Sequence, residues 1–326
     1  MKSNGSRREF LIKLGLGGAA VTTAGSLRAA DGKKLPEKVE QRRLGKIGTE
    51  VSLLGLGLGS VFVRAFEDHP EEREAVLLRA LDRGVNYWDT ARAYGISEEL
   101  IGPVVEKHRN RIYLVSKSAD RSYDGFKREL ETSLKNLRTD HIDLYHIHNL
   151  KPSRDHDLDA IGKGAVRAAK EAREEGIIGN FGITGHSGVE ILMEGIRRWD
   201  PDALLTVFPV DRPDNGAYED QLLPLARERN MGVVAMKTVR WARNSDLPGP
   251  QLVRYGMSLE GVASAIVGLD SLAHLEENAD MASDFEPMAA DLRSEMSEYV
   301  RGRLADLGSA PWENPGYEDR VEPRFA

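Results

Sequence analysis

Short apolar runs of strand length alternate with longer segments of helical periodicity between residues 51 and 281. The runs are continuously apolar, as expected of strands that are buried on both faces of a parallel sheet. Counting residues 51–57 first, eight such runs each precede a helical segment or its equivalent. Eight βα units in about 230 residues match the size of a closed barrel. The pattern therefore predicts an α/β fold, a (β/α)8 TIM barrel.

The segment boundaries follow from apolar periodicity and from the glycines that end several helical segments, such as Gly84 and Gly176. Ser97 is expected to cap the helix that it begins. The predicted strands span residues 51–57, 85–89, 112–116, 142–148, 179–184, 203–210, 232–237 and 263–269. The predicted helices span residues 71–83, 97–106, 125–137, 160–175, 189–198, 219–229, 250–256 and 272–281.

Additional elements flank the barrel pattern. Residues 41–50 predict an N-terminal β-hairpin whose turn uses Gly45 and Gly48 to reach positive φ. Residues 286–307 predict an extra C-terminal helix, and residues 308–326 form a tail without periodicity. A doubly wound sheet would also alternate strands and helices. The glycines at 55, 57 and 59 match a dinucleotide-binding loop poorly, because the third comes too early and no strong helix is expected directly after it.

The N-terminus resembles an export signal. Arg7 and Arg8 precede a short stretch rich in Gly and Ala, and SRREFLIK resembles the twin-arginine signature. This stretch is too short to span about 30 Å of hydrocarbon as a helix. A basic tail or an uncleaved anchor is the alternative interpretation. The chain is thus divided into a signal and linker (1–35), a barrel (36–285), and a C-terminal helix with its tail (286–326).

Composition excludes several classes of function. The net charge of -7 argues against a nucleic-acid-binding surface, which needs clustered basic residues. The absence of cysteine excludes disulfides, thiolate metal sites and a cysteine nucleophile.

Four residues with acid–base chemistry lie at or just past three consecutive predicted strands: Asp89, Tyr94, Lys117 and His148. Barrel enzymes collect their chemistry at the C-terminal ends of the strands, so these side chains are expected to converge. A phenol titrates at about pH 10 in water, and a neighbouring ammonium favours the phenolate. Such a group could protonate a carbonyl oxygen as it is reduced. The hydride would have to come from a nicotinamide cofactor, because no side chain can supply one.

Each of these residues also has a structural interpretation, and other classes of function remain open. Asp89 could cap a loop and Lys117 could extend to solvent. His146 and His148 place two imidazoles on one face of a strand, which a metal-dependent barrel enzyme could use. No further ligand stands out on the later strands, and we predict no metal.

The local sequences around these residues resemble the aldo-keto reductase family. The similarity lies in GVNYWDTARAYGISEELIG, IYLVSKS, HIDLYHIH and QRRLGKIGTEVSLLGLG, and it covers about residues 40–281. The resemblance implies that Asp89, Tyr94, Lys117 and His148 form the catalytic tetrad of an NAD(P)H-dependent enzyme. A non-catalytic, nucleotide-binding relative of these reductases is the alternative.

The resemblance also implies a cofactor site for NADP(H) or NAD(H), although several positions depart from the family pattern. Thr184-Gly185-His186 stands where a Ser-Asn pair often holds the nicotinamide, and Phe208 replaces a glutamine. At the end of the seventh strand, Met236 followed by Lys237 stands where an aromatic residue commonly stacks on the nicotinamide. Gly268, Leu269 and His274 occupy positions that are cationic in NADPH users, so the choice between NADPH and NADH stays open. The implied cofactor-binding residues are Gly57, Thr184, Gly185, Met236, Lys237, Gly268, Glu277 and Asn278.

The expected partners are a small-molecule carbonyl substrate and the twin-arginine export machinery, with no nucleic acid and a monomeric state. The expected location is the periplasm, or the cytoplasm if the signal is inefficient. Substrate specificity should come from loops at residues 61–70, 149–159, 212–218 and 239–249 and from the tail. Aromatic candidates for the pocket wall are Trp88, Trp241, Trp312 and Tyr317.

Overall fold

The computed structural model describes residues 10, 14, 37–212, 216–314 and 316–317. The twin-arginine motif and nearly all of the predicted signal lie outside these residues. Phe10 and Leu14 are both buried, and the ring of Phe10 lies 5.1 Å from that of Tyr299. The division of the chain at residues 35 and 285 stays a prediction.

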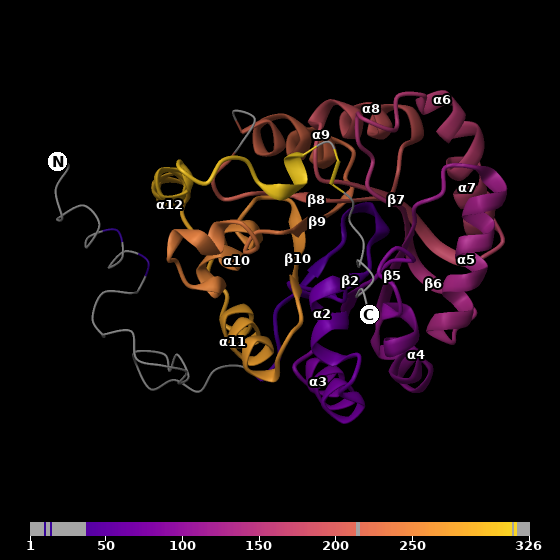
Figure 1. The fold of residues 1–326 in the computed structure, drawn as a ribbon, viewed down its shortest axis with the longest axis horizontal. Helices are drawn as coiled ribbons and strands as arrows, with labels where there is room; N and C mark the ends of the chain where they lie inside the picture. The colour runs from indigo at the N-terminus through magenta and orange to yellow at the C-terminus, as the bar shows by residue number, and fades with distance from the viewer. Residues whose placement is uncertain (1–9, 11–13, 15–36, 213–215, 315, 318–326) are drawn as a thin grey trace.

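A closed barrel of eight parallel strands forms the centre of the molecule, which confirms the predicted fold class (Figure 1). The strands are ordered β10-β3-β4-β5-β6-β7-β8-β9, so neighbours in sequence are neighbours in the barrel. Their bounds are Leu54–Gly57 (β3), Tyr87–Asp89 (β4), Tyr113–Ser118 (β5), Ile142–Ile147 (β6), Ile178–Gly185 (β7), Ala203–Val207 (β8), Gly232–Met236 (β9) and Val262–Gly268 (β10).

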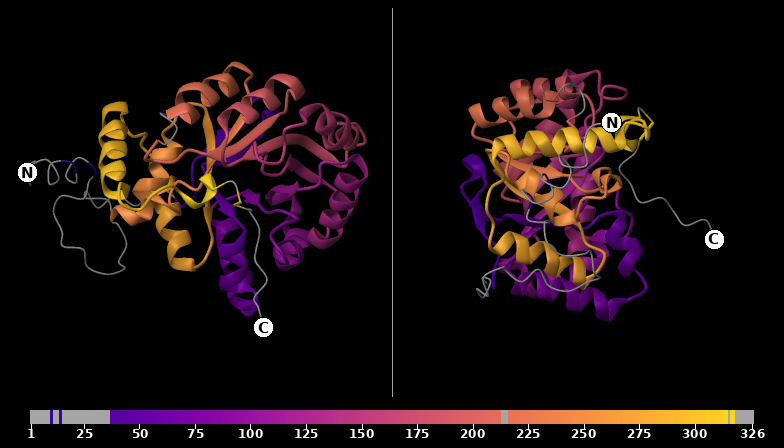
Figure 2. Two further views of the ribbon diagram at one scale, coloured as in Figure 1. Left: turned by 45° about the horizontal axis from the view of Figure 1, so that its top comes forward. Right: turned by 90° about the vertical axis from the view of Figure 1, so that its left-hand side faces the viewer.

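Helices surround the barrel, and α12 lies at its periphery (Figures 1 and 2). The α-helices are Ser60–Phe66 (α2), Pro70–Asp82 (α3), Ser97–His108 (α4), Tyr123–Leu137 (α5), Leu158–Ile161 (α6), Arg167–Glu174 (α7), Val189–Trp199 (α8), Leu223–Glu228 (α9), Gly249–Met257 (α10), Leu272–Ser283 (α11) and Ala290–Leu304 (α12). Short 3-10 helices are Gly45–Ile47 (η1), Arg109–Arg111 (η2), Ala242–Ser245 (η6) and Pro311–Glu313 (η7), and π-helical turns are Gly162–Val166 (η3) and Tyr218–Leu222 (η5).

The N-terminal hairpin is confirmed. Strands β1 (Gln41–Arg43) and β2 (Glu50–Ser52) pair antiparallel, and the turn between them places Gly45 and Gly48 at φ values of 45° and 83°. A Cβ at Gly45 would lie 2.3 Å from the backbone of Met231, so only glycine fits there.

Helix α2 was not predicted. It directly follows the glycine-rich run and buries Phe62, Val63 and Phe66. A helix of this length is marginal in isolation, so its stability comes from packing that sequence periodicity does not reveal.

Two helix predictions were wrong in detail. Ile96, not Ser97, is the N-cap of α4. The hydroxyl of Ser97 is fully buried and instead bonds Thr90 Oγ1 at 2.8 Å and the carbonyl of Leu58. The single helix predicted for residues 160–175 is interrupted by η3, where Gly164 has non-helical angles. A Cβ on Gly164 would lie 2.3 Å from the Arg121 carbonyl oxygen, so this close approach requires glycine.

The C-terminal segment returns from α12 to the barrel mouth (Figure 1). Trp312 on this segment is only 1% exposed. Tyr317 then contacts residues that follow β6, β7 and β9, as described below. Tyr317, which lies in this aperiodic segment, therefore forms part of the mouth through tertiary contacts.

Candidate active site

The barrel brings the four predicted catalytic residues together at its C-terminal end. Asp89 is the last residue of β4, Lys117 is the penultimate residue of β5, and His148 directly follows β6. Tyr94 lies in the loop between β4 and α4. All four are buried, with Tyr94 the most exposed at 9%. The convergence expected from the strand order is therefore present.

Lys117 is the centre of the cluster. Its Nζ donates to Asp89 Oδ1 at 2.6 Å and to the Thr90 carbonyl at 2.7 Å, and it lies 5.0 Å from the centre of the Tyr94 ring. A buried ammonium of this kind is stabilised only if its charge is balanced and its protons are bonded. Asp89 supplies that balance, and the ion pair lies next to the phenol.

Tyr94 and His148 face each other across the mouth. Their ring centres are 5.5 Å apart and the ring planes meet at 87°, an edge-to-face arrangement. The imidazole thus borders the phenol on the side of β6. The two groups can act on the same small molecule.

A second layer of buried polar groups fixes the loop that carries Tyr94, and the sequence reading missed it. Glu98 is fully buried, accepts from Arg92 Nη1 at 2.7 Å and accepts from Ser116 Oγ at 2.7 Å. The backbone N–H of Arg92 donates to the Lys117 carbonyl at 3.1 Å. These bonds tie the loop to β5. No sequence motif marks them, because Glu98 resembles an ordinary acidic residue in the first turn of a helix.

His146 lies beneath the tetrad inside the barrel. It pairs in register with Lys117, and a Cβ at Gly182 would lie 2.4 Å from its Nδ1, so glycine leaves room for the ring. Burial, followed by the charges of Lys117 and His148, holds the pKa of His146 well below its usual range. Within the described part of the chain, no group of three or more acidic or histidine residues could hold a metal ion.

A cavity of about 250 Å³ opens beside the tetrad. Asp89 and Tyr94 line it, and so do four residues of the predicted cofactor set: Gly57, Met236, Lys237 and Gly268. The cavity wall also includes residues that were not assigned to the cofactor site: Gly59, Ser60, Val61, Thr238, Val239, Arg240, Arg243, Ile266, Val267 and Asp270. Lys237, Arg240 and Arg243 give this wall a cationic side.

The other predicted cofactor residues lie elsewhere. Asn278 borders a smaller cavity next to Gly268, and its Oδ1 is buried without a hydrogen-bond partner among the described residues. Glu277 is exposed on α11. Thr184 and Gly185 do not line the main cavity. Thr184 Oγ1 accepts from the Asn149 N–H at 2.8 Å, and Gly185 packs close to the Leu150 carbonyl.

The predicted aromatic wall is only partly present. Trp88 is fully buried and donates from Nε1 to the Val85 carbonyl, and Trp312 is also buried, so both pack in the interior. Trp241 packs against the core. Tyr317 is the member of this set that reaches the cationic residues at the mouth.

A hydrogen-bonded relay joins three strand ends at the mouth. Lys237 Nζ lies 2.8 Å from His186 Nε2, and His186 Nδ1 lies 2.9 Å from Asn149 Oδ1. Lys237 has a φ of 59°, unusual for a residue with a side chain. His186 is 1% exposed. The sequence placed His186 next to the cofactor positions but gave no signal that it contacts Lys237.

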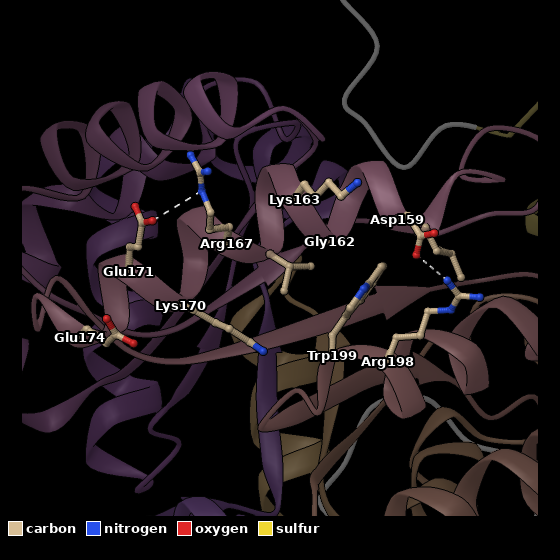
Figure 3. Close-up of a pocket in the computed structure, with 11 residues that line it drawn as sticks. Asp159, Gly162, Lys163, Arg167, Lys170, Glu171, Glu174, Arg198 and Trp199 are labelled. Carbon is tan, nitrogen blue, oxygen red and sulfur yellow. Dashed lines mark hydrogen bonds and ion pairs between the residues drawn. The ribbon is translucent and has the colours of Figure 1, made fainter.

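A larger groove of about 880 Å³ lies on the outer helices between α6, η3, α7 and α8. Figure 3 shows Trp199 and the pairs Arg167–Glu171 and Arg198–Asp159 around it, with Lys163 at its edge. None of the four predicted catalytic residues lines this groove. The four predicted catalytic residues therefore lie at the barrel mouth, away from this groove.

Comparison with known proteins gives consistent matches. The model of the Aldo/keto reductase family matches residues 53–247. The chain is similar to L-galactose dehydrogenase of Arabidopsis thaliana, at 24% identity over 84% of this chain and 97% of that protein. It is also similar to an aldo-keto reductase structure of Pseudomonas aeruginosa, with 30% identity, a TM-score of 0.61 and coverage of 74% and 94% of the two chains. A structure from Klebsiella pneumoniae, in complex with NADP and acetate, shares the fold with a TM-score of 0.65 and 21% identity over 80% and 95% of the two chains. Among the described residues, no helix is long and apolar enough to cross a membrane.

Proposed function

The chain belongs to the aldo/keto reductase family of NAD(P)H-dependent oxidoreductases, and we propose that it reduces an aldehyde or ketone, or oxidises the corresponding alcohol, with Tyr94 as general acid and base. The observation that carries this proposal is the buried Lys117–Asp89 pair, at 2.6 Å, beside the Tyr94 ring. A tyrosine that only formed part of a turn would not require a buried lysine, paired with a carboxylate, next to its ring.

Each member of the tetrad then has a distinct task. The Tyr94 hydroxyl gives its proton to the carbonyl oxygen as negative charge develops there, and Lys117 stabilises the phenolate that remains. Asp89 pairs with Lys117 and fixes its position. His148 donates to the substrate oxygen and orients it. In the oxidising direction the phenolate takes the proton from the alcohol.

The residues around the cavity fit a nicotinamide dinucleotide. Lys237, Arg240 and Arg243 can bind phosphate oxygens, and the glycines at 57 and 268 let a ligand approach the backbone. Asn278 Oδ1 is buried beside a cavity of only about 10 Å³, so its assignment to the adenine end rests on the family resemblance alone. When bound, this cofactor supplies or accepts the hydride. Thr184 and Gly185 do not line this cavity, and we assign them no contact with the cofactor.

For the substrate, we propose a small polyhydroxy carbonyl compound. The similarity to a protein named L-galactose dehydrogenase supports a sugar-like substrate. Two alternatives make different predictions. A non-catalytic relative would bind nucleotide without turnover, and a metal-dependent enzyme would need a divalent ion and no nucleotide.

The deciding experiment is titration of the purified protein with NADPH and NADH in parallel, followed by intrinsic fluorescence, with a carbonyl turnover assay on the same preparation. Binding of either nucleotide together with turnover supports the reductase. Binding without turnover of any aldehyde supports the non-catalytic alternative. Absence of binding to both nucleotides contradicts the proposal.

We further propose that the protein is exported by the twin-arginine route with its cofactor already bound. The basis is the SRREFLIK motif and the expectation that free nicotinamide dinucleotide is scarce outside the cytoplasm. The cofactor would then be recycled in place by paired substrates. Cell fractionation, combined with nucleotide analysis of the exported protein, tests this proposal. Protein found only in the cytosol, or purified without nucleotide and exchanging it rapidly, contradicts it.

A further inference from the structure

We propose that Arg121 is a positioning residue for His148: its guanidinium holds the backbone of the loop that follows β6 and thereby fixes where the imidazole stands at the barrel mouth. Arg121 lies in the loop between β5 and α5, and β5 and β6 are paired neighbours in the barrel. It does not line the cavity beside Tyr94, so it acts through His148 and not on the substrate. The inference rests on the proposed function, in which His148 donates to the substrate oxygen.

The guanidinium of Arg121 joins the two loops directly. Nη2 donates to the His148 carbonyl at 2.7 Å and to the Asn149 carbonyl at 3.1 Å. Nη1 donates to the Ala119 carbonyl, in its own loop, at 3.1 Å. The donors of a guanidinium form a rigid planar fork, so these bonds set the distance and the angle between the loops. The imidazole projects from the same residue whose carbonyl is bound, and its position follows from that of the backbone.

Asp155 holds the guanidinium in this orientation. Its carboxylate accepts from Arg121 Nε at 2.8 Å and from Arg121 Nη2 at 3.0 Å, and Asp155 is only 2% exposed. A two-point bond of this kind adds geometric specificity as well as energy. Asp155 also accepts from the Lys151 N–H at 3.0 Å, so Arg121 is tied to the loop after β6 at two separate points.

The backbone of Arg121 is fixed from the other side. Its carbonyl accepts from the Ala165 N–H at 2.9 Å, where η3 interrupts the helical segment. A Cβ at Gly164 would lie 2.3 Å from the same oxygen, so glycine at this position lets the helical segment approach. The guanidinium therefore projects from a backbone that is itself anchored.

The turn that Arg121 holds has an unfavourable backbone conformation. β6 ends at Ile147, and Asn149 has a φ of 54°, which is uncommon and costly for a residue with a side chain. The Asn149 carbonyl also accepts from Arg154 Nη2 at 2.7 Å, and its N–H donates to Thr184 Oγ1 at 2.8 Å. Loss of the Arg121 bonds should let this turn relax and displace the imidazole that precedes it.

Arg109 makes a matching arrangement at the opposite end of the same two strands. It lies just before β5, donates from Nε and Nη2 to the His141 carbonyl at 3.2 and 3.0 Å, and pairs with Asp143 at 2.8 Å. The four tetrad residues lie at the other end of the barrel. In barrels of this kind the C-terminal end carries the chemistry and the N-terminal end contributes stability. Arg109 is therefore the matched control for Arg121.

The first test compares kcat in Arg121→Lys and Arg109→Lys, in full-chain protein saturated with whichever nucleotide it binds and with DL-glyceraldehyde as the carbonyl probe. Lysine keeps the positive charge but cannot reproduce a planar fork. We expect kcat to fall at least tenfold in Arg121→Lys and less than twofold in Arg109→Lys, with the nucleotide Kd changed less than threefold in both. Equal losses of kcat in the two variants, or no loss in Arg121→Lys, would overturn the proposal.

A double-mutant cycle shows whether Arg121 acts through His148. In a His148→Gln background, Arg121→Lys should lower kcat by less than a further twofold, because the side chain that it positions is absent. Asp155→Asn is the second variant and leaves Arg121 in place without its carboxylate. Its kcat should fall at least threefold, and again only when His148 is present. Losses that simply multiply in the double variants would overturn the proposal, because their effect would not pass through His148.

Histidine NMR separates this inference from the proposed function, because it needs no turnover. The eight histidines can be labelled with ¹³C at Cε1, and His148→Gln identifies the His148 signal. We expect this signal to move in Arg121→Lys and to stay in place in Arg109→Lys. Such a movement without any turnover in the wild type would contradict the proposed function but support the positioning role. An identical His148 signal in wild type and Arg121→Lys would overturn the proposal.

Discussion

Lys117 Nζ and Asp89 Oδ1 form an ion pair of 2.6 Å in which both side chains are at most 2% exposed. Breaking such a pair by removing one partner leaves a buried charge and typically costs about 3–5 kcal/mol. The same ammonium is the cation nearest the Tyr94 ring among the described contacts. Stability and the proposed catalytic role therefore meet at Lys117.

Lys117→Met should lower both stability and turnover. We expect the free energy of unfolding to fall by about 3 kcal/mol, because Asp89 loses its counter-ion. We expect kcat to fall at least 100-fold and the pH dependence of the remaining activity to change. Denaturant unfolding and steady-state kinetics measure the two effects. Lys163→Met is the surface control, and unchanged kcat in Lys117→Met would refute the assigned role.

Tyr94→Phe should abolish proton transfer while leaving nucleotide binding intact. The ring that packs against His148 is retained, so only the hydroxyl is lost. We expect kcat to fall by about 10²–10⁴, the usual contribution of a general acid or base, with less than a threefold change in the nucleotide Kd. If nucleotide binding disappears together with activity, Tyr94 has a structural role instead.

The barrel and the tetrad could be predicted because their signals are local. Buried parallel strands read as apolar runs, and residues at their C-terminal ends must converge whatever the loops do. Asp89, Lys117 and His148 needed only that topology to be brought together, whereas Tyr94 also depends on the loop bonds of Arg92 and Glu98. Their roles in catalysis stay a prediction.

The rest of the site depends on contacts between distant segments. The burial of Thr184 Oγ1 against the Asn149 N–H and the bond from Lys237 to His186 have no signature in any one stretch of sequence. The placement of Tyr317 on Arg240 depends on the path of an aperiodic tail. Helix α2 and the displaced cap at Ser97 were missed for the same reason, because tertiary packing decided them.

Asp155→Asn should lower the free energy of unfolding, mainly at neutral pH. Asp155 is 2% exposed and accepts from Arg121 Nε at 2.8 Å, from Arg154 Nη2 at 3.2 Å and from the Lys151 N–H at 3.0 Å. Burial alone would raise its pKa, but these partners outweigh burial and hold the pKa below its ordinary value.

The stability that Asp155 contributes is therefore present above the unfolded pKa of about 3.9 and is lost as the pH falls through the lower folded value. We expect Asp155→Asn to lose about 3 kcal/mol at pH 7, because Arg121 is left without its buried partner, and the difference from wild type should shrink below pH 4. Denaturant unfolding at pH 7, 5 and 3.5 checks this. If the difference in free energy of unfolding between the variant and the wild type stays constant with pH, then packing and not charge determines the contribution of Asp155.

His146 should make the protein sensitive to mild acid. Burial, followed by the charges of Lys117 and His148, lowers the pKa of His146 in the folded state well below 6.5. The unfolded chain binds its proton at about pH 6.5, so stability is full above that pH and falls by about 1.4 kcal/mol per pH unit below it. Between pH 6.5 and pH 5 this amounts to about 2 kcal/mol, in a window separate from that of Asp155.

His146→Met removes the titrating group and replaces it with an apolar side chain of similar size, which suits a site where neither ring nitrogen has a hydrogen bond of normal geometry among the described residues. When the pH is lowered from 6.5 to 5, the free energy of unfolding should fall by about 2 kcal/mol less in the variant than in the wild type. Denaturant unfolding at the two pH values measures this difference. The other histidines contribute equally to both proteins, so the difference isolates His146. Parallel pH profiles would mean that His146 is protonated in the folded barrel, which the adjacent ammonium of Lys117 strongly opposes.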